Sequence, residues 1–176
     1  IQYESKINIS IPEYLRMIHL KTSTLLECSI ILGVLTSNFN DDSLKSKFSS
    51  LGKILGNIFQ IRDDVLGIWG TDDTGKPIGS DIKKKKKSLP IIHGLTHQNS
   101  SISKKIHDFL SQEFISDSEV NHVIDILNEA GSKTYCQELI KEYWSEGEKI
   151  IDDLNISNSF KIDFQELGTY LSGRHS

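Results

Sequence analysis

The stretch from Leu44 to Trp69 constrains the fold most, because its apolar periodicity predicts one long amphipathic helix. At about 100° per residue, Asp63 lies at the centre of one face of this helix. The residues that share that face are Gly52, Gly56, Phe59, Gln60 and Gly67, and the opposite, apolar face carries Leu51, Ile54, Ile58, Ile61, Val65 and Ile68. Glycine inside a helix costs about 1 kcal/mol relative to alanine. The glycines therefore indicate that space is needed there, either for a closely packed helix or for a ligand.

A polar, lysine-rich loop follows this helix, from Gly70 to Ser88. Turns are predicted at Thr74-Gly75 and at Lys76-Pro77, and Asp81 precedes a run of lysines. Carboxylates beside lysines suit a multiply charged anion that is held partly through Mg²⁺, since Mg²⁺ prefers oxygen ligands and lysine is a compact cation for phosphate. Taken alone, the lysine run is more often a solvated loop.

Composition narrows the class of protein. The chain has 176 residues, which fits one domain, and a net charge of −4, which argues against general nucleic-acid binding. Cys28 and Cys136 both fall in predicted helices and are expected to be reduced, buried thiols. No apolar run is expected to approach the roughly 18 residues needed to cross a bilayer. A soluble, cytoplasmic protein is expected, and because the chain begins at Ile1 it is expected to be a fragment, a processed product or one piece of a split protein.

The rest of the chain also predicts helices. The sequence around Ser10, Pro12 and Glu13 is typical of a helix start, and that helix is expected to run to about Leu35 with Lys21 in its inward stripe. Without an anionic partner, Lys21 would reach out to water instead. Further helices are expected over Leu89 to Gln98, Ile102 to Gln112, Ser116 to Gly131, Ser132 to Leu154 and Phe160 to Leu171. No strand pattern is present, so the prediction is a single all-α domain over residues 1–176.

Several short motifs together resemble a known family. In chain order they are Lys21-Thr22, Phe59-Gln60 with Asp63-Asp64, Gly75-Lys76-Pro77, Gly79-Ser80-Asp81 and Lys86 to Pro90. This order resembles the C-terminal half of the isoprenyl diphosphate synthases, also called polyprenyl synthetases, from about Tyr14 to Leu95. Beyond Leu95 the resemblance rests on the helix pattern and on Arg174. It implies the C-terminal portion of the isoprenoid synthase helical bundle, without the N-terminal helices of the complete fold.

The resemblance also implies a reaction. In this family an allylic diphosphate is ionised with the help of Mg²⁺, and isopentenyl diphosphate attacks the resulting cation to give a longer polyprenyl diphosphate. Asp63 would be the main Mg²⁺ ligand and Asp64 its support, while Asp81 would tie down the loop. The residues implied to bind substrate are Lys21, Thr22, Phe59, Gln60, Lys76 and Lys86, and among all of these Lys21, Asp63 and Lys76 are the catalytic candidates.

The chain departs from the family pattern at three points. Gly67 stands at the third acidic position of the motif that begins at Asp63, and Lys85 stands where glycine is common. The family's first aspartate-rich motif would lie upstream of this chain. A missing N-terminal half or a second chain is therefore expected as a partner, in a homodimer or a heterodimer. A noncatalytic partner subunit of a complete synthase is the alternative, and a terpene cyclase is disfavoured by the Lys21-Thr22 and Gly75-Lys76-Pro77 motifs.

Overall fold

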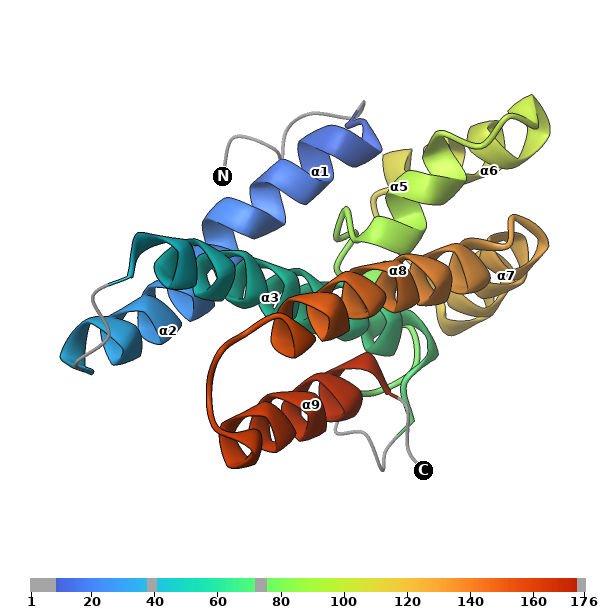
Figure 1. The fold of residues 1–176 in the computed structure, drawn as a ribbon. Helices are drawn as coiled ribbons and strands as arrows, with labels where there is room; N and C mark the ends of the chain where they lie inside the picture. Colours follow the sequence, from blue (N-terminus) through green and yellow to red (C-terminus); the bar gives the residue numbers. More distant parts are fainter. Residues whose placement is uncertain (1–8, 38–40, 72–75, 174–176) are drawn as a thin grey trace. The chain divides into compact units, whose positions relative to one another are not determined.

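The computed structural model describes residues 9–37, 41–71 and 76–173, and these residues form helices and connecting loops without a strand (Figure 1). The all-α prediction is therefore confirmed. The helices are α1 (Ile11–Ile18), a π-helical turn (His19–Ser23), α2 (Thr24–Thr36), α3 (Asp42–Trp69), α4 (Ser80–Lys83), α5 (Leu89–Leu95), α6 (Ser100–Ser111), α7 (Asp117–Glu129), α8 (Ser132–Asp152) and α9 (Asn158–Ser172).

The chain divides into two compact units. The first contains the described residues up to Tyr14 together with Asp63–Glu138, and the second contains Leu15–Arg62 together with the described residues from Leu139 onward. Helices α3 and α8 each contribute residues to both units. The expectation of a single domain stays a prediction.

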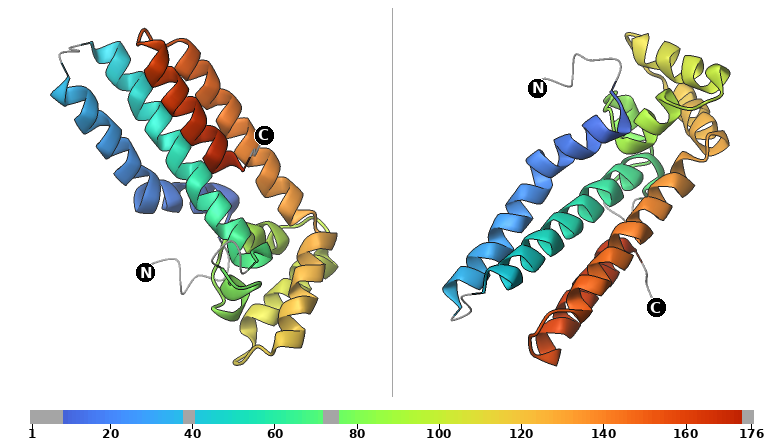
Figure 2. Two further views of the ribbon diagram at one scale, coloured as in Figure 1. Left: turned by 90° about the horizontal axis from the view of Figure 1, so that it is seen from below. Right: turned by 45° about the horizontal axis from the view of Figure 1, so that its top comes forward.

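The core of the first unit forms where α5, α6 and α7 pack together (Figure 2). Its buried members include Ile91, Ile106, Phe109, Val123 and Leu127. Helix α7 begins as the sequence predicts, because Ser116 and Glu119 form a complete capping box. Gly131 follows the helix with φ +67°, a left-handed conformation that glycine adopts without strain.

In the second unit, α2 packs closely on the glycine side of α3. A Cβ atom on Gly52 would lie 2.6 Å from Cα of Glu27, and one on Gly56 would overlap the backbone of Ser23. The apolar side of α3 is buried as predicted, with Leu51, Ile54, Ile58 and Ile61 each at most 4% exposed. Of the two explanations for the glycines, close helix packing is therefore the one the structure supports at Gly52 and Gly56.

Helix α9 completes the second unit beside the parts of α3 and α8 that belong to it (Figure 2). The indole of Trp144 is fully buried, and a side chain at Gly168 would overlap it. The rings of Phe48 and Phe164 pack with their centroids 5.8 Å apart. Trp144 is thus a core residue, as the sequence predicts.

The first helical segment begins as predicted but buries a different face. Ser10 and Glu13 bond each other's backbone N–H groups, which confirms the predicted helix start. Lys21 and Cys28, however, are exposed, and Leu25 is 69% exposed, so the predicted inward stripe and the buried Cys28 thiol are wrong. The π-helical turn accounts for the difference, because its wider turn shifts the face presented by every later residue. Cys136 is buried as predicted.

The same segment corrects the expectation about membrane spans. Ile11–Thr36 is long and apolar enough to cross a membrane by length and composition, although it includes Lys21 and Glu27. Only 17% of its most apolar 18-residue window is buried. Exposed leucines account for much of this surface, at Leu20, Leu25, Leu32 and Leu35.

Candidate functional site

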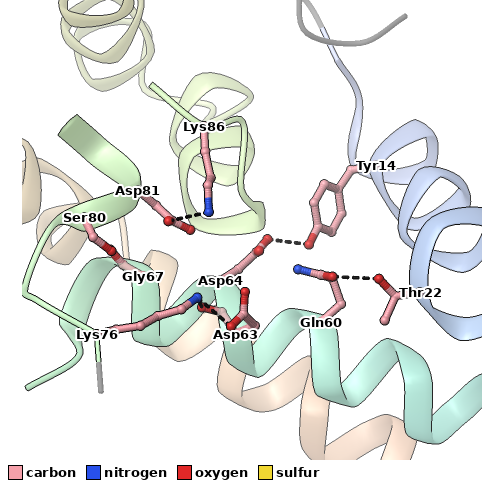
Figure 3. Close-up of polar contacts among 10 residues, drawn as sticks. All are labelled: Tyr14, Thr22, Gln60, Asp63, Asp64, Gly67, Lys76, Ser80, Asp81 and Lys86. Atoms are coloured by element: carbon pink, nitrogen blue, oxygen red, sulfur yellow. Dashed lines mark hydrogen bonds and ion pairs between the residues drawn. The ribbon is translucent and has the colours of Figure 1, made fainter. Parts of the chain in front are cut away.

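Asp63 and Lys76 form an ion pair in the first unit. Asp63 lies near the end of α3, and Nζ of Lys76 is 2.5 Å from its Oδ1 (Figure 3). The same ammonium group donates a hydrogen bond to the backbone carbonyl of Asp63, at 3.1 Å. The Asp63 side chain is 37% exposed, so its carboxylate remains accessible to a ligand. The structure thus brings together two of the residues that the sequence singles out.

Asp64 is held differently, because it is buried at 6% exposure. Its Oδ2 accepts a hydrogen bond from the phenol of Tyr14 and another from the backbone N–H of Leu89, at 2.8 Å. Burial raises the pKa of Tyr14 well above its usual value, and the neighbouring Asp64 carboxylate raises it further. These contacts fix the Asp64 carboxylate in place. Sequence reasoning placed Tyr14 on an inward face but did not connect it to Asp64.

Asp81 and Lys86 form a second ion pair in this unit. Nζ of Lys86 lies 2.7 Å from Oδ1 of Asp81, which is only 2% exposed (Figure 3). The backbone N–H of Lys86 also donates to the carbonyl of Asp81, at 2.9 Å, so the loop closes on itself here. The hydrogen bond to Asp81 raises the pKa of Lys86, and the charges of Asp63 and Asp64 add to this effect. Lys86 therefore senses all three carboxylates.

In the second unit, Thr22 and Gln60 are hydrogen-bonded, with the hydroxyl of Thr22 donating to Oε1 of Gln60 at 2.8 Å. One turn earlier on α3, the buried Asn57 accepts a hydrogen bond from Ser23 at 2.6 Å. The sequence gave no signal for Asn57, because a single amide in an amphipathic helix is unremarkable. Phe59 is 46% exposed and Lys21 is exposed, so both can meet a ligand.

Some sequence predictions lie outside the described residues, namely the turn at Thr74-Gly75 and the terminal Arg174. Within the described ranges, no group of three or more histidine, cysteine, aspartate or glutamate side chains is arranged to hold a metal ion. Lysines occupy positions beside Asp63 and Asp81 instead.

The comparison with protein families adds a decisive observation. Residues 1–127 match the model of the family described as polyprenyl synthetase. The chain belongs to the polyprenyl synthetase family. This match covers the segments that contain Asp63, Lys76, Asp81 and Lys86.

Individual polyprenyl synthetases agree with this assignment. The chain is 26% identical to a (2E,6E)-farnesyl diphosphate synthase of Mycobacterium tuberculosis, over 99% of this chain and 49% of the relative. Among solved structures, the geranylgeranyl pyrophosphate synthetase of Pyrococcus horikoshii is 32% identical with a TM-score of 0.86, over 99% of this chain and 52% of that one. The geranylgeranyl pyrophosphate synthase of Corynebacterium glutamicum, in complex with calcium and isoprenyl diphosphate, is 25% identical with a TM-score of 0.79, over 93% and 50% of the two chains. The chain thus spans about half the length of the polyprenyl synthetases it matches.

Proposed function

We propose that this chain carries the diphosphate-binding half of a prenyltransferase that condenses an allylic diphosphate with isopentenyl diphosphate. The observation that carries the proposal is the pair of acid–lysine contacts, Asp63 with Lys76 and Asp81 with Lys86, in a chain of the polyprenyl synthetase family. Lysines that stand beside acidic groups can exchange those partners for the oxygens of a bound diphosphate. The names of the matched relatives, all synthases, do not favour the alternative of a noncatalytic partner.

The residues of the first unit fit Mg²⁺ as the cofactor. The accessible Asp63 carboxylate would hold it, and the fixed Asp64 carboxylate would support the ion or its waters. One or two carboxylates together with substrate phosphates are a sufficient ligand set for Mg²⁺. A bound Mg²⁺ would supply charge neutralisation of the diphosphate. The C. glutamicum synthase in complex with calcium and isoprenyl diphosphate gives a precedent for a divalent ion with this ligand.

The side chains of this chain would act mainly through electrostatics. Negative charge grows on the diphosphate as its bond to the allylic carbon breaks, and fixed ammonium groups aimed at that charge lower the barrier. Lys76 and Lys86 are the candidates in the first unit, because each is held at a defined position by a carboxylate. The resemblance assigns further contacts to Lys21, Thr22, Phe59 and Gln60, and catalysis to Lys21, Asp63 and Lys76; these roles remain predictions.

The test is incorporation of labelled isopentenyl diphosphate into longer prenyl chains, with geranyl diphosphate and Mg²⁺, by the native protein including any segment that accompanies this chain. Asp63→Ala should lower the rate by at least about 100-fold, since a charge-stabilising group at the reacting centre is lost. The exposed Asp125→Ala on α7 is the matched control and should retain full activity. Unchanged incorporation by Asp63→Ala would overturn the proposal.

A further inference from the structure

The carboxylate of Asp81 occupies the space that a side chain at position 67 would need. Gly67 is buried on α3, and a Cβ atom built on it would overlap Cγ and Oδ2 of Asp81. Ser80, next to Asp81, keeps this part of α4 on the helix by donating to the carbonyl of Gly67, at 3.4 Å. Position 67 is the place where the aspartate-rich motif has glycine instead of an acid. A carboxylate is thus present there, supplied by a different segment of the chain (Figure 3).

This carboxylate is only half satisfied. Oδ1 of Asp81 is paired with Lys86, whereas Oδ2 has no hydrogen-bond partner among the described residues, although Asp81 is only 2% exposed. A buried carboxylate oxygen without a partner is costly. Loop closure alone does not explain this arrangement, because the Lys86 contact and the backbone bond to Asp81 already achieve it. The free oxygen is available for a cation or for a water bound to one.

Lys86 connects Asp81 with the motif on α3. Its ammonium group contacts Asp81 directly and also interacts with the charges of Asp63 and Asp64. A cation that neutralises three carboxylates in this way marks where a metal and an anion would together replace it: the anion would take the lysine, and the metal would take the carboxylates.

We infer that Asp81 is the third acidic residue of the metal and diphosphate site, carried on α4 in place of a side chain at Gly67. The inference rests on the proposed function, and it goes beyond the sequence expectation that Asp81 only ties down the loop. Gly67 and Asp81 form a reciprocal pair, because position 67 can bear a side chain only if the Asp81 carboxylate leaves. An acid at both positions would clash, and an acid at neither would leave the site one carboxylate short.

The test is a titration with Mn²⁺, followed by electron paramagnetic resonance, in the absence of diphosphate. Asp81→Asn keeps the shape of the side chain and should weaken Mn²⁺ binding by about tenfold or more. Asp117→Asn is the matched control, since it removes the carboxylate of an exposed ion pair with Lys83 in the same unit, and should bind as the unmodified protein does. Thermal unfolding of each variant shows that it is folded.

Two further variants separate a metal role from an indirect one. Lys86→Gln removes a competing cation, so Mn²⁺ should bind at least as tightly as in the unmodified protein. If Asp81 acted only by holding Lys86, this variant would weaken Mn²⁺ binding as Asp81→Asn does, and that result would overturn the inference. Gly67→Asp alone should lower the unfolding temperature, and the exchange Gly67→Asp with Asp81→Gly should recover Mn²⁺ affinity to within about threefold of the original.

The outcomes also distinguish failure of this inference from failure of the proposed function. Loss of Mn²⁺ binding in Asp63→Ala, together with normal binding in Asp81→Asn, would overturn the role of Asp81 and leave the proposed site intact. Absence of Mn²⁺ binding to the unmodified protein, with and without inorganic diphosphate, would overturn both.

Discussion

The phenol of Tyr14 donates a hydrogen bond to the buried carboxylate of Asp64, which lies 50 residues further along the chain. The contact fixes the second residue of the aspartate pair on α3, while the first, Asp63, faces Lys76. Two adjacent carboxylates therefore have different surroundings: one is buried among hydrogen-bond donors and the other is partly exposed beside a lysine. This difference suits Asp64 to a supporting role and Asp63 to direct contact with a ligand.

Replacing Tyr14 with phenylalanine should destabilise the protein. The change removes a hydrogen bond to a buried, charged acceptor, and such bonds contribute about 1.5–3 kcal/mol to the free energy of unfolding. Asp64 keeps its bond from the N–H of Leu89, so the fold should persist. Urea denaturation of the unmodified protein and of Tyr14→Phe measures the loss.

A double-mutant cycle with Asp64→Asn tests whether this contact is responsible. The two changes together should cost clearly less than the sum of the single changes, because the same interaction is removed by either one. Strictly additive losses would show that the Tyr14 hydroxyl stabilises the fold through something other than Asp64.

Gly56 should not tolerate alanine. A methyl group there would overlap the backbone of Ser23, which cannot move aside as a flexible side chain can, and overpacking of this kind costs about 1–3 kcal/mol. Gly33→Ala in α2 is the matched control, since nothing lies within 4 Å of its added methyl group. Better helix propensity should stabilise that variant by up to about 1 kcal/mol. The unfolding free energies of the two variants should thus change in opposite directions, and a stabilised Gly56→Ala would contradict the close packing of α2 on α3.

These glycines also show how far the sequence could predict the structure. Periodicity placed Gly52, Gly56 and Gly67 on one face of a helix and correctly buried the opposite face. It could not say what fills the space, because that depends on segments distant in sequence: α2 at Gly52 and Gly56, and Asp81 at Gly67. A pattern of missing side chains defines room, and only the tertiary structure identifies the occupant.

Local signals predicted other elements well. The paired hydrogen bonds at Ser10 with Glu13 and at Ser116 with Glu119 follow from residues three apart, so the sequence alone was sufficient to place these helix starts. The exposed face of α2 was missed because the π-helical turn before it breaks the 100° progression, and Thr24–Thr36 is apolar on most sides. For such a helix, periodicity does not distinguish a buried face from an exposed one.

The candidate site lies between these extremes. The proximity of Lys76 to Asp63 and of Lys86 to Asp81 agrees with the short loop between them, and the sequence could indicate it. Tyr14 could not be assigned to Asp64, since the two belong to helices far apart in the chain and a tyrosine in an apolar stripe is usually an ordinary core residue. Lys85 is different: glycine is common at that position in the family, and its φ of +50° gives the physical reason.

His93 should make the stability of the protein depend on pH. Its Nδ1 lies 2.9 Å from Oγ of the buried Ser132, its ring stacks on that of Tyr135 with centroids 4.4 Å apart, and His97 approaches with its edge. Burial, and to a lesser extent the charge of His97, lower the pKa of His93 below its usual value. Below about pH 6.5 the unfolded chain therefore takes up a proton that the folded one resists, so acidification favours unfolding. Above that pH both states are neutral, and the contribution vanishes.

Thermal unfolding between pH 7.5 and pH 5.5 measures this effect. The unfolding temperature of the unmodified protein should fall as the pH drops through the ordinary histidine range, and His93→Gln should show a smaller fall because it removes the titrating ring. The exposed His122→Gln on α7 is the control and should keep the original slope. An unaltered pH dependence in His93→Gln would mean that the acid sensitivity arises elsewhere, because the lowered pKa of His93 requires the folded state to disfavour its protonation.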